Sequence, residues 1–294
     1  MIKRLFFVIL IIMLILVIAE IVLRLLGFGY SVFYKKNDKI RPGYRIFCVG
    51  ESTTCGVGAS NPEEHNYPRQ LELILKEHYE DDDIQCFFDL GIGVNSSEML
   101  LKMPDYIKRY RPSLIILMVG ANNWWNLDKS NIILFNKNQY ISNAALRCLI
   151  FMDRLRLWKL FKWIRMSLGL YSERCWLQHD TTKDEDLSEQ KQTLYRMLAE
   201  HDIAEMVKMC KSSGVDVITS GYPMESGGLR FIDQEIAQTF DIPFVNNFEL
   251  FRALPDLDLY ISKDGWHPNE RGYRLLADNV YRCIIKNKMI KRQP

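Results

Sequence analysis

Five short apolar runs alternate with helical patterns between Tyr44 and Ile285. The runs are Arg45–Val49, Ile84–Leu90, Ser113–Val119, Val215–Ser220 and Ile242–Val245. Strands that are buried on both faces form continuous apolar runs, so the alternation predicts a parallel sheet covered by helices on both sides. The expected fold class is therefore α/β, a three-layer α/β/α arrangement with five parallel strands. The strands of such a sheet end at a common edge, where ligands bind.

Four helices are expected between and after these strands: Tyr67–Tyr79, Ser97–Tyr110, Glu189–Ser212 and Glu270–Ile285. Pro104 lies within the second of them. Because proline is tolerated in the first turn of a helix and disrupts its interior, the alternative is that this helix starts at Pro104.

The first 30 residues have a different character. Leu5–Ala19 is an unbroken apolar run, and the apolar character continues to Phe28, interrupted only by Glu20 and Arg24. About 24 such residues suffice to cross a bilayer core of roughly 30 Å as a helix. Glu20 and Arg24 are four residues apart, so they share a helix face and are expected to pair near the interface. A cleaved signal peptide is the alternative, but its apolar region would be shorter and no A-x-A cleavage site follows.

Residues 1–29 are therefore interpreted as a transmembrane anchor of a single-pass membrane protein, and residues 30–43 as a polar tether. The orientation stays open. Two basic residues precede the span and five follow it, which by the positive-inside rule keeps the following domain in the cytoplasm. Against this count, Glu20 can neutralise Arg24, and the other basic residues lie in the tether before a large folded domain.

The composition excludes several functions. Of 294 residues, 48% are hydrophobic and 25% charged, with a net charge of +2. This balance gives no electrostatic argument for nucleic acid as a partner. None of the seven cysteines lies in a C-x-x-C motif or at zinc spacing from a histidine, so neither a metal nor another cofactor is implied.

A helical insertion is expected around residues 126–186. Within it, Ile150–Tyr171 mixes aromatic and basic residues, and one helical stripe collects Ile150, Leu157, Leu160, Phe161, Ile164 and Leu168. The preferred interpretation is one helix that packs this stripe on the core while its basic side chains extend into water. The alternative is an interfacial helix that lies on the membrane.

The sequence Gly50-Glu51-Ser52 follows the first strand directly. A glycine there permits a sharp turn, and Ser52 would stand at the carboxyl end of the strand as a candidate nucleophile. The alternative is that Ser52 only caps the next helix. Asp264 and His267 are three residues apart, so one turn could place the carboxylate against an imidazole nitrogen. Acyl transfer needs such a base and carboxylate together with a nucleophile and oxyanion donors.

Four separated blocks carry a family resemblance: Gly50–Ser52, Asp89–Ser97, Gly120–Asn123 and Asp264–His267. In this order, each after a predicted strand or before the last helix, they resemble the motifs of the SGNH hydrolases, also called the GDSL family. The resemblance implies a flavodoxin-like fold and no cofactor. It implies Ser52 as nucleophile, His267 as base and Asp264 as the orienting carboxylate. The oxyanion donors would be the Ser52 N–H, the Gly93 N–H and the Asn122 side chain.

The chain departs from the family pattern in three places. Glu51 and Asn123 each stand where the family has Asp, and the second block is one residue short. Anchoring that block on Asn95 makes Gly93 the oxyanion donor; without the gap, Val94 would fill the position.

The resemblance implies that residues 44–290 form a serine esterase or deacylase domain. Its substrate would be a small O-acyl ester, above all an acetyl ester, and could be an acylated carbohydrate. The alternatives are an O-acyltransferase using the same site, and a non-catalytic membrane-anchored domain that binds glycans or a protein. Trp124, Trp125 and Trp266 lie beside the motifs and could stack on a sugar, although core packing is preferred. Because anchored family members commonly modify envelope or surface glycans, the catalytic domain is expected outside the cytoplasm.

Overall fold

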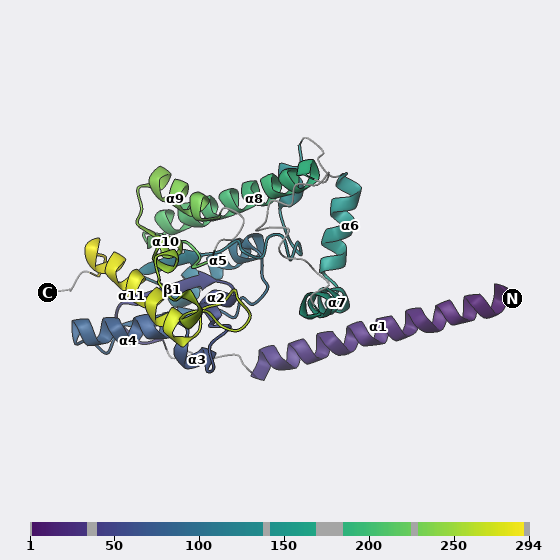
Figure 1. Ribbon diagram of the computed structural model, residues 1–294, viewed down its shortest axis with the longest axis horizontal. Helices are drawn as coiled ribbons and strands as arrows, with labels where there is room; N and C mark the ends of the chain where they lie inside the picture. The colour runs from purple at the N-terminus through teal and green to yellow at the C-terminus, as the bar shows by residue number, and fades with distance from the viewer. Residues whose placement is uncertain (1, 34–39, 138–141, 169–184, 225–228, 291–294) are drawn as a thin grey trace. The chain divides into compact units, whose positions relative to one another are not determined.

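The computed structural model describes residues 2–33, 40–137, 142–168, 185–224 and 229–290 (Figure 1). The chain divides into two compact units. One comprises Met1–Lys39 and Ser142–His179, and the other comprises Ile40–Ile141 and Asp180–Pro294. Residues 34–39 of the expected tether lie outside the described residues.

The second unit contains a five-stranded parallel sheet, as predicted. Its strands are β1 (Arg45–Gly50), β2 (Gln85–Phe88), β3 (Leu114–Met118), β4 (Asp216–Ser220) and β5 (Phe244–Val245). They are ordered β2-β1-β3-β4-β5, and every pair is parallel. All five residues of β3 are buried, which explains why this strand is an apolar run without alternation.

The strand order creates a switch point beside β1. From β1 the chain passes to β2 on one side, and then to β3, β4 and β5 on the other. Gly50 at the end of β1 is in register with Met118 at the end of β3. Helical connections therefore leave in opposite directions from adjacent strand ends, and a crevice opens there in folds of this kind.

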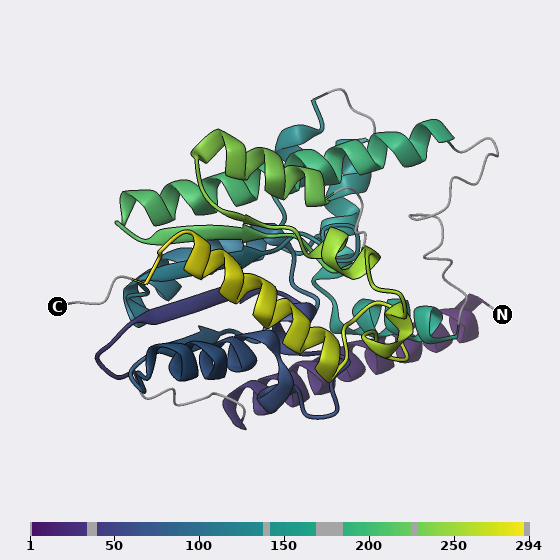
Figure 2. The same cartoon turned by 60° about the vertical axis from the view of Figure 1, so that its left-hand side comes forward.

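Helices cover both faces of the sheet (Figure 2). On one face, α4 (Tyr67–Tyr79) packs against α11 (Glu270–Lys286), and on the other α5 (Ser96–Tyr110), α8 (Glu185–Ser212) and α9 (Leu229–Phe240) pack together. The three-layer fold prediction is confirmed. Shorter helices lie in the connections: α2 (Ser52–Cys55), α3 (Pro62–His65), η1 (Ile132–Phe135), α10 (Asn247–Arg252) and η3 (Leu257–Leu259).

The predicted helix Ser97–Tyr110 is confirmed as α5, and the alternative that it starts at Pro104 is wrong, because Pro104 lies inside the helix. The Pro104 position is exposed, whereas the opposite face of α5 buries Met99, Met103 and Tyr106. Burial of this apolar face stabilises α5 enough to keep the helix continuous despite the hydrogen bond lost at proline.

The described part of the first unit contains three helices: α1 (Ile2–Phe33), α6 (Asn143–Asp153) and α7 (Arg156–Ser167). In α1, Lys3–Gly29 contains an 18-residue window with a mean hydropathy of 3.4 and is long enough to cross a membrane or to act as a signal sequence. The expected pair of Glu20 and Arg24 is present, with 2.7 Å between Oε1 and Nη2.

The single helix expected over Ile150–Tyr171 is wrong, because the chain breaks between α6 and α7. The Glu20 carboxylate of α1 accepts hydrogen bonds from the backbone N–H groups of Arg156 (3.0 Å) and Leu157 (2.9 Å). These are the first two N–H groups of α7, which have no partner inside the helix. A residue far away in the sequence thus fixes where α7 begins.

Candidate active site

The turn after β1 presents Ser52. A Cβ atom at Gly50 would lie 2.8 Å from the carbonyl oxygen of Met118, so the close approach of β1 and β3 requires glycine. Ser52 is the first residue of α2, and the N-cap position belongs to Glu51, whose side chain makes no capping bond. The alternative that Ser52 only caps a helix is therefore wrong. Its hydroxyl oxygen lies 2.8 Å from Nε2 of His267.

A tight loop before α11 positions His267. Ile261 and Pro268 form an isolated antiparallel bridge, and the Ser262 N–H donates to the His267 carbonyl at 2.8 Å. Inside this loop, Oδ2 of Asp264 lies 2.7 Å from Nδ1 of His267. The second nitrogen of the same ring faces Ser52, so the three side chains form a continuous hydrogen-bonded series.

Hydrogen bonds fix the Asp264 carboxylate in this loop. Its Oδ1 accepts from the Ser262 hydroxyl (2.7 Å) and from the N–H groups of Trp266 and His267 (2.9 Å each). Partial burial alone would raise the pKa of Asp264, but these hydrogen bonds outweigh it and lower the pKa to about 2. The group is therefore a carboxylate at neutral pH, which holds the His267 Nδ1 proton and aims Nε2 at Ser52.

Two donors lie on neighbouring loops without a partner among the described residues. The Asn122 amide nitrogen, in the loop after β3, is buried and makes no hydrogen bond. Gly93 follows β2 with φ of +69°, a conformation that favours glycine, and its N–H has no partner. The neighbouring Val94 N–H donates to the Gly91 carbonyl at 3.1 Å, so it is already engaged.

Glu51 links the loop of Ser52 to that of Asn122. It is 1% exposed, and its carboxylate accepts from the Gly120 N–H (2.9 Å) and the Tyr222 hydroxyl (2.8 Å). Burial raises the pKa of Glu51 to about 7, although both hydrogen bonds lower it. Tyr222 was not identified from the sequence. It lies two residues after the end of β4, and other candidate site residues likewise follow the ends of strands, so this position was the signal that could have identified it.

Buried asparagines support the Gly93 loop. The Asn126 amide donates to the Gly93 carbonyl at 2.8 Å, and the Asn95 amide donates to the Asn126 carbonyl at 2.7 Å. Asn123 accepts the Ser96 N–H at 2.9 Å, at the start of α5. Asn123 therefore stabilises the loop structure, because its neutral amide oxygen accepts a hydrogen bond from the N–H group of the first residue of α5.

The tryptophans differ in exposure. Trp266, beside His267, is 37% exposed, so its interpretation as a core residue is wrong. Trp124 and Trp125 are half-buried, and a Cβ atom at Gly93 would lie 3.7 Å from Nε1 of Trp125. Two of the three indoles therefore flank the candidate catalytic groups.

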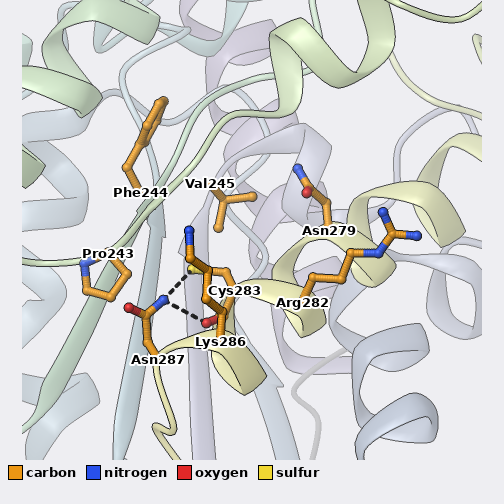
Figure 3. Close-up of a pocket in the computed structure, with 8 residues that line it drawn as sticks. All are labelled: Pro243, Phe244, Val245, Asn279, Arg282, Cys283, Lys286 and Asn287. Atoms are coloured by element: carbon orange, nitrogen blue, oxygen red, sulfur yellow. Dashed lines mark hydrogen bonds between the residues drawn. The ribbon is translucent and has the colours of Figure 1, made fainter.

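A pocket of about 330 Å³ lies elsewhere, between β5 and α11 (Figure 3). It is lined by Pro243, Phe244, Val245, Asn279, Arg282, Cys283, Lys286 and Asn287, and includes none of the candidate catalytic residues. Across the described ranges, no three His, Cys, Asp or Glu side chains are arranged to hold a metal ion.

Comparison with solved structures supports the fold. The chain is similar to a lipase/acylhydrolase from Enterococcus faecalis, with 13% identity and a TM-score of 0.52 over 86% of this chain and all of the other. It is also similar to the structure of TesA, with 13% identity and a TM-score of 0.50 over 84% of this chain and 99% of the other. At this identity the likeness establishes the fold alone.

Comparison of sequences establishes the family. No curated protein sequence matches this chain. The profile of the GDSL-like Lipase/Acylhydrolase family matches residues 48–275, which contain the turn after β1, both donor loops and the loop before α11. The chain therefore belongs to the GDSL-like lipase/acylhydrolase family and is an ester-hydrolysing enzyme.

Proposed function

We propose that the protein hydrolyses small O-acyl esters with Ser52 as nucleophile, His267 as general base and Asp264 as orienting carboxylate. The observation that carries the proposal is the pair of hydrogen bonds about one imidazole ring. Nδ1 of His267 lies 2.7 Å from Asp264, and Nε2 lies 2.8 Å from Ser52. This is the arrangement of a base that can take the serine proton and return it to a leaving group.

The proposed reaction has two steps. Nε2 of His267 takes the Ser52 proton while Oγ bonds to the ester carbonyl carbon; the tetrahedral intermediate then collapses, and the alcohol leaves with that proton. In the second step, water gives a proton to His267 and attacks the acyl group, which leaves as the acid while Ser52 recovers its proton. Asp264 stabilises the imidazolium in both steps.

We assign the oxyanion to three donors: the N–H groups of Ser52 and Gly93 and the Asn122 amide. The support is that Asn122 and Gly93 leave donors unused among the described residues. A buried donor without a partner costs free energy, which a developing oxyanion would recover. Engagement of the Val94 N–H by Gly91 favours Gly93 for this role.

The proposed substrate is an acetyl ester, carried by a carbohydrate. The support is the placement of tryptophans: Trp266 is exposed next to His267, and Trp125 lies beside Gly93. Indole faces stack on sugar rings. Either water or a sugar hydroxyl could attack the acyl-enzyme at such a site. Attack by water gives hydrolysis and attack by a sugar hydroxyl gives acyl transfer, so the assay has to distinguish these two reactions.

The experiment measures turnover by the purified full chain on acyl esters of graded length, with and without sugar acceptors. Ser52→Ala, His267→Ala and the double variant should all lose turnover to a similar extent, because residues that act as a unit are not additive. Ser213→Ala, an exposed serine in the same unit, is the matched control and should retain full turnover. A double variant far slower than either single variant would show independent roles and reject the triad.

We also propose that α1 anchors the protein in a bilayer. Lys3–Gly29 has the length and hydropathy for a span, and Glu20 contributes hydrogen bonds to the start of α7, a role that a cleaved leader would lose. The catalytic unit is proposed to lie outside the cytoplasm, where acylated surface glycans would be its substrates.

A further inference from the structure

The helix pair α6–α7 leaves large apolar side chains exposed. On α7, Leu160 and Ile164 are 38% and 42% exposed, and Leu168 just beyond it is 66% exposed. These three residues are spaced by four, so they line one side of the helix. Phe161 (47%) and Trp163 (55%) flank that side. A continuous exposed apolar stripe of this kind marks a binding surface.

The same segment is strongly basic. Between Asn143 and Leu168 the chain has six basic residues and one acidic residue. The single acid, Asp153, is buried and pairs with Lys162 at 2.6 Å, so it does not offset the charge of the surface. Arg147, Arg154 and Arg156 are exposed. An apolar stripe with aromatic residues, bordered by cations, is typical of helices that lie in the interface of an anionic bilayer.

The contact with α1 indicates the depth at which α7 lies. The 27 residues of Lys3–Gly29 rise about 40 Å at 1.5 Å per residue, close to the thickness of a bilayer with its headgroups. Glu20, which holds the first N–H groups of α7, lies about 13 Å before Gly29 along the helix. With about 5 Å of headgroups on either side of a core of about 30 Å, Glu20 lies about 8 Å inside the acyl-chain region, within the depth of about 5–10 Å to which amphipathic helices bury their apolar faces.

The Glu20 contact also explains how charged groups are accommodated at that depth. Arg24 donates to the Glu20 carboxylate at 2.8 Å and to the Arg154 carbonyl at 2.8 Å. Glu20, Arg24 and the first turn of α7 thus satisfy one another's hydrogen bonds. Ionised groups in the interface need such partners, and the pairing leaves apolar side chains facing outward.

We propose that α7 is an interfacial helix whose apolar stripe lies among the outer part of the acyl chains, on the C-terminal side of the α1 span. The apolar stripe faces the bilayer itself. Two observations support this occupant: hydrogen bonds from Glu20 tie the start of α7 to α1, which has the length and hydropathy of a membrane span, and basic residues border the stripe. The proposal rests on α1 as the proposed membrane anchor and is independent of the catalytic site.

The experiment places a nitroxide label at Trp163→Cys in a Cys148→Ser, Cys175→Ser, Cys283→Ser background. The full chain is reconstituted in nanodiscs of phosphatidylcholine and phosphatidylglycerol, and collision with oxygen is compared with collision with a water-soluble nickel chelate. The oxygen-to-nickel ratio should be several-fold higher at Trp163→Cys than at Leu259→Cys, an exposed position of the catalytic unit. A label at Ile164→Cys on the same stripe should agree, which guards against local misfolding.

Two further measurements separate the possible outcomes. A label at Leu14→Cys should be buried in lipid; a water-exposed label there would reject both the anchor and the interfacial helix. Glu20→Gln should move the Trp163→Cys label toward water while the Leu14→Cys label stays in lipid. A Trp163→Cys label as nickel-accessible as Leu259→Cys would overturn the proposal and assign the stripe to a protein partner. Turnover on a soluble ester, measured in parallel, tests the proposed hydrolysis separately.

Discussion

Glu51 differs from the family's usual aspartate by one methylene, and its contacts explain how that difference is accommodated. The longer side chain reaches the Gly120 N–H and the Tyr222 hydroxyl at hydrogen-bond distance. Gly120 begins the loop that carries Asn122, so Glu51 connects the turn of Ser52 to the loop of the proposed oxyanion donor. The carboxyl group is fully enclosed. Asp233 is also buried nearby, and its carboxylate oxygens have no hydrogen-bond partner among the residues that the structure describes.

The raised pKa of Glu51 predicts a pH dependence of stability. The pKa of Glu51 is about 7 in the folded protein and 4.5 for an ordinary glutamate, so between these pH values the folded protein binds more protons than the unfolded chain. The contribution of Glu51 to the free energy of unfolding should therefore be highest below about pH 4.5 and should fall as the pH rises to about 7. Burial raises the pKa of Asp233 as well, which adds a loss of the same sign.

Urea titrations at several pH values test this dependence. Glu51→Gln should reduce the decline of unfolding free energy between about pH 4.5 and pH 7, because the amide does not ionise. The exposed Glu63→Gln is the matched control and should leave the decline unchanged. An identical decline in Glu51→Gln would show that Glu51 is not the titrating group.

Asn122→Ala should lower turnover by about 100-fold or more, with little change in KM, because an oxyanion donor acts only in the transition state. Steady-state kinetics on a soluble acyl ester measure both constants. A higher KM with normal turnover would instead place the Asn122 amide in ground-state substrate binding.

At the scale of elements, the strands could be predicted to within one or two residues at most ends because burial on both faces gives continuous apolar runs. Because the carboxyl ends of parallel strands lie at one edge of the sheet, Ser52 and Asn122 could then be predicted to lie at the same edge. The break between α6 and α7 could not be predicted, since Glu20, more than 130 residues away, supplies its hydrogen bonds. Tyr222 and Asn126 were missed for the same reason: their roles depend on tertiary contacts with Glu51 and Gly93.

Pro104 offers a test at the same scale. Pro104→Ala should stabilise the protein by about 1–3 kcal/mol, because alanine restores an N–H donor in the interior of α5 and removes the clash of the proline ring. The gain is reduced by the greater freedom of the unfolded chain. Urea unfolding measures it, with the neighbouring exposed Asp105→Ala as control. A destabilised Pro104→Ala would mean that the proline ring itself is needed for the stability of α5.

At the scale of the whole molecule, the chain combines a helical unit built on α1 with a catalytic unit built on the sheet. The bilayer argument for α1 rests on length and hydropathy, which a signal sequence can share. By the positive-inside rule, the basic residues on either side of the span favour the opposite orientation from the one proposed, so the orientation needs a direct test.

Fusions after Pro294 test that orientation. Alkaline phosphatase at this position should be active, and a fluorescent protein that folds only in the cytoplasm should be dark, because the proposed domain is exported. The fusion protein should also remain in the membrane fraction at its full length. Inactive phosphatase together with a bright cytoplasmic reporter would place the catalytic unit inside the cell.

The reactivity of Ser52 tests the central claim most directly. A fluorophosphonate probe bonds covalently to a serine that is activated by a neighbouring base, and mass spectrometry of the digested protein locates the adduct. We predict one adduct, on the peptide that contains Ser52, formed rapidly by the folded full chain and suppressed in His267→Ala. A folded protein that does not react, or one that carries the adduct on another serine, would contradict the assignment of Ser52, His267 and Asp264.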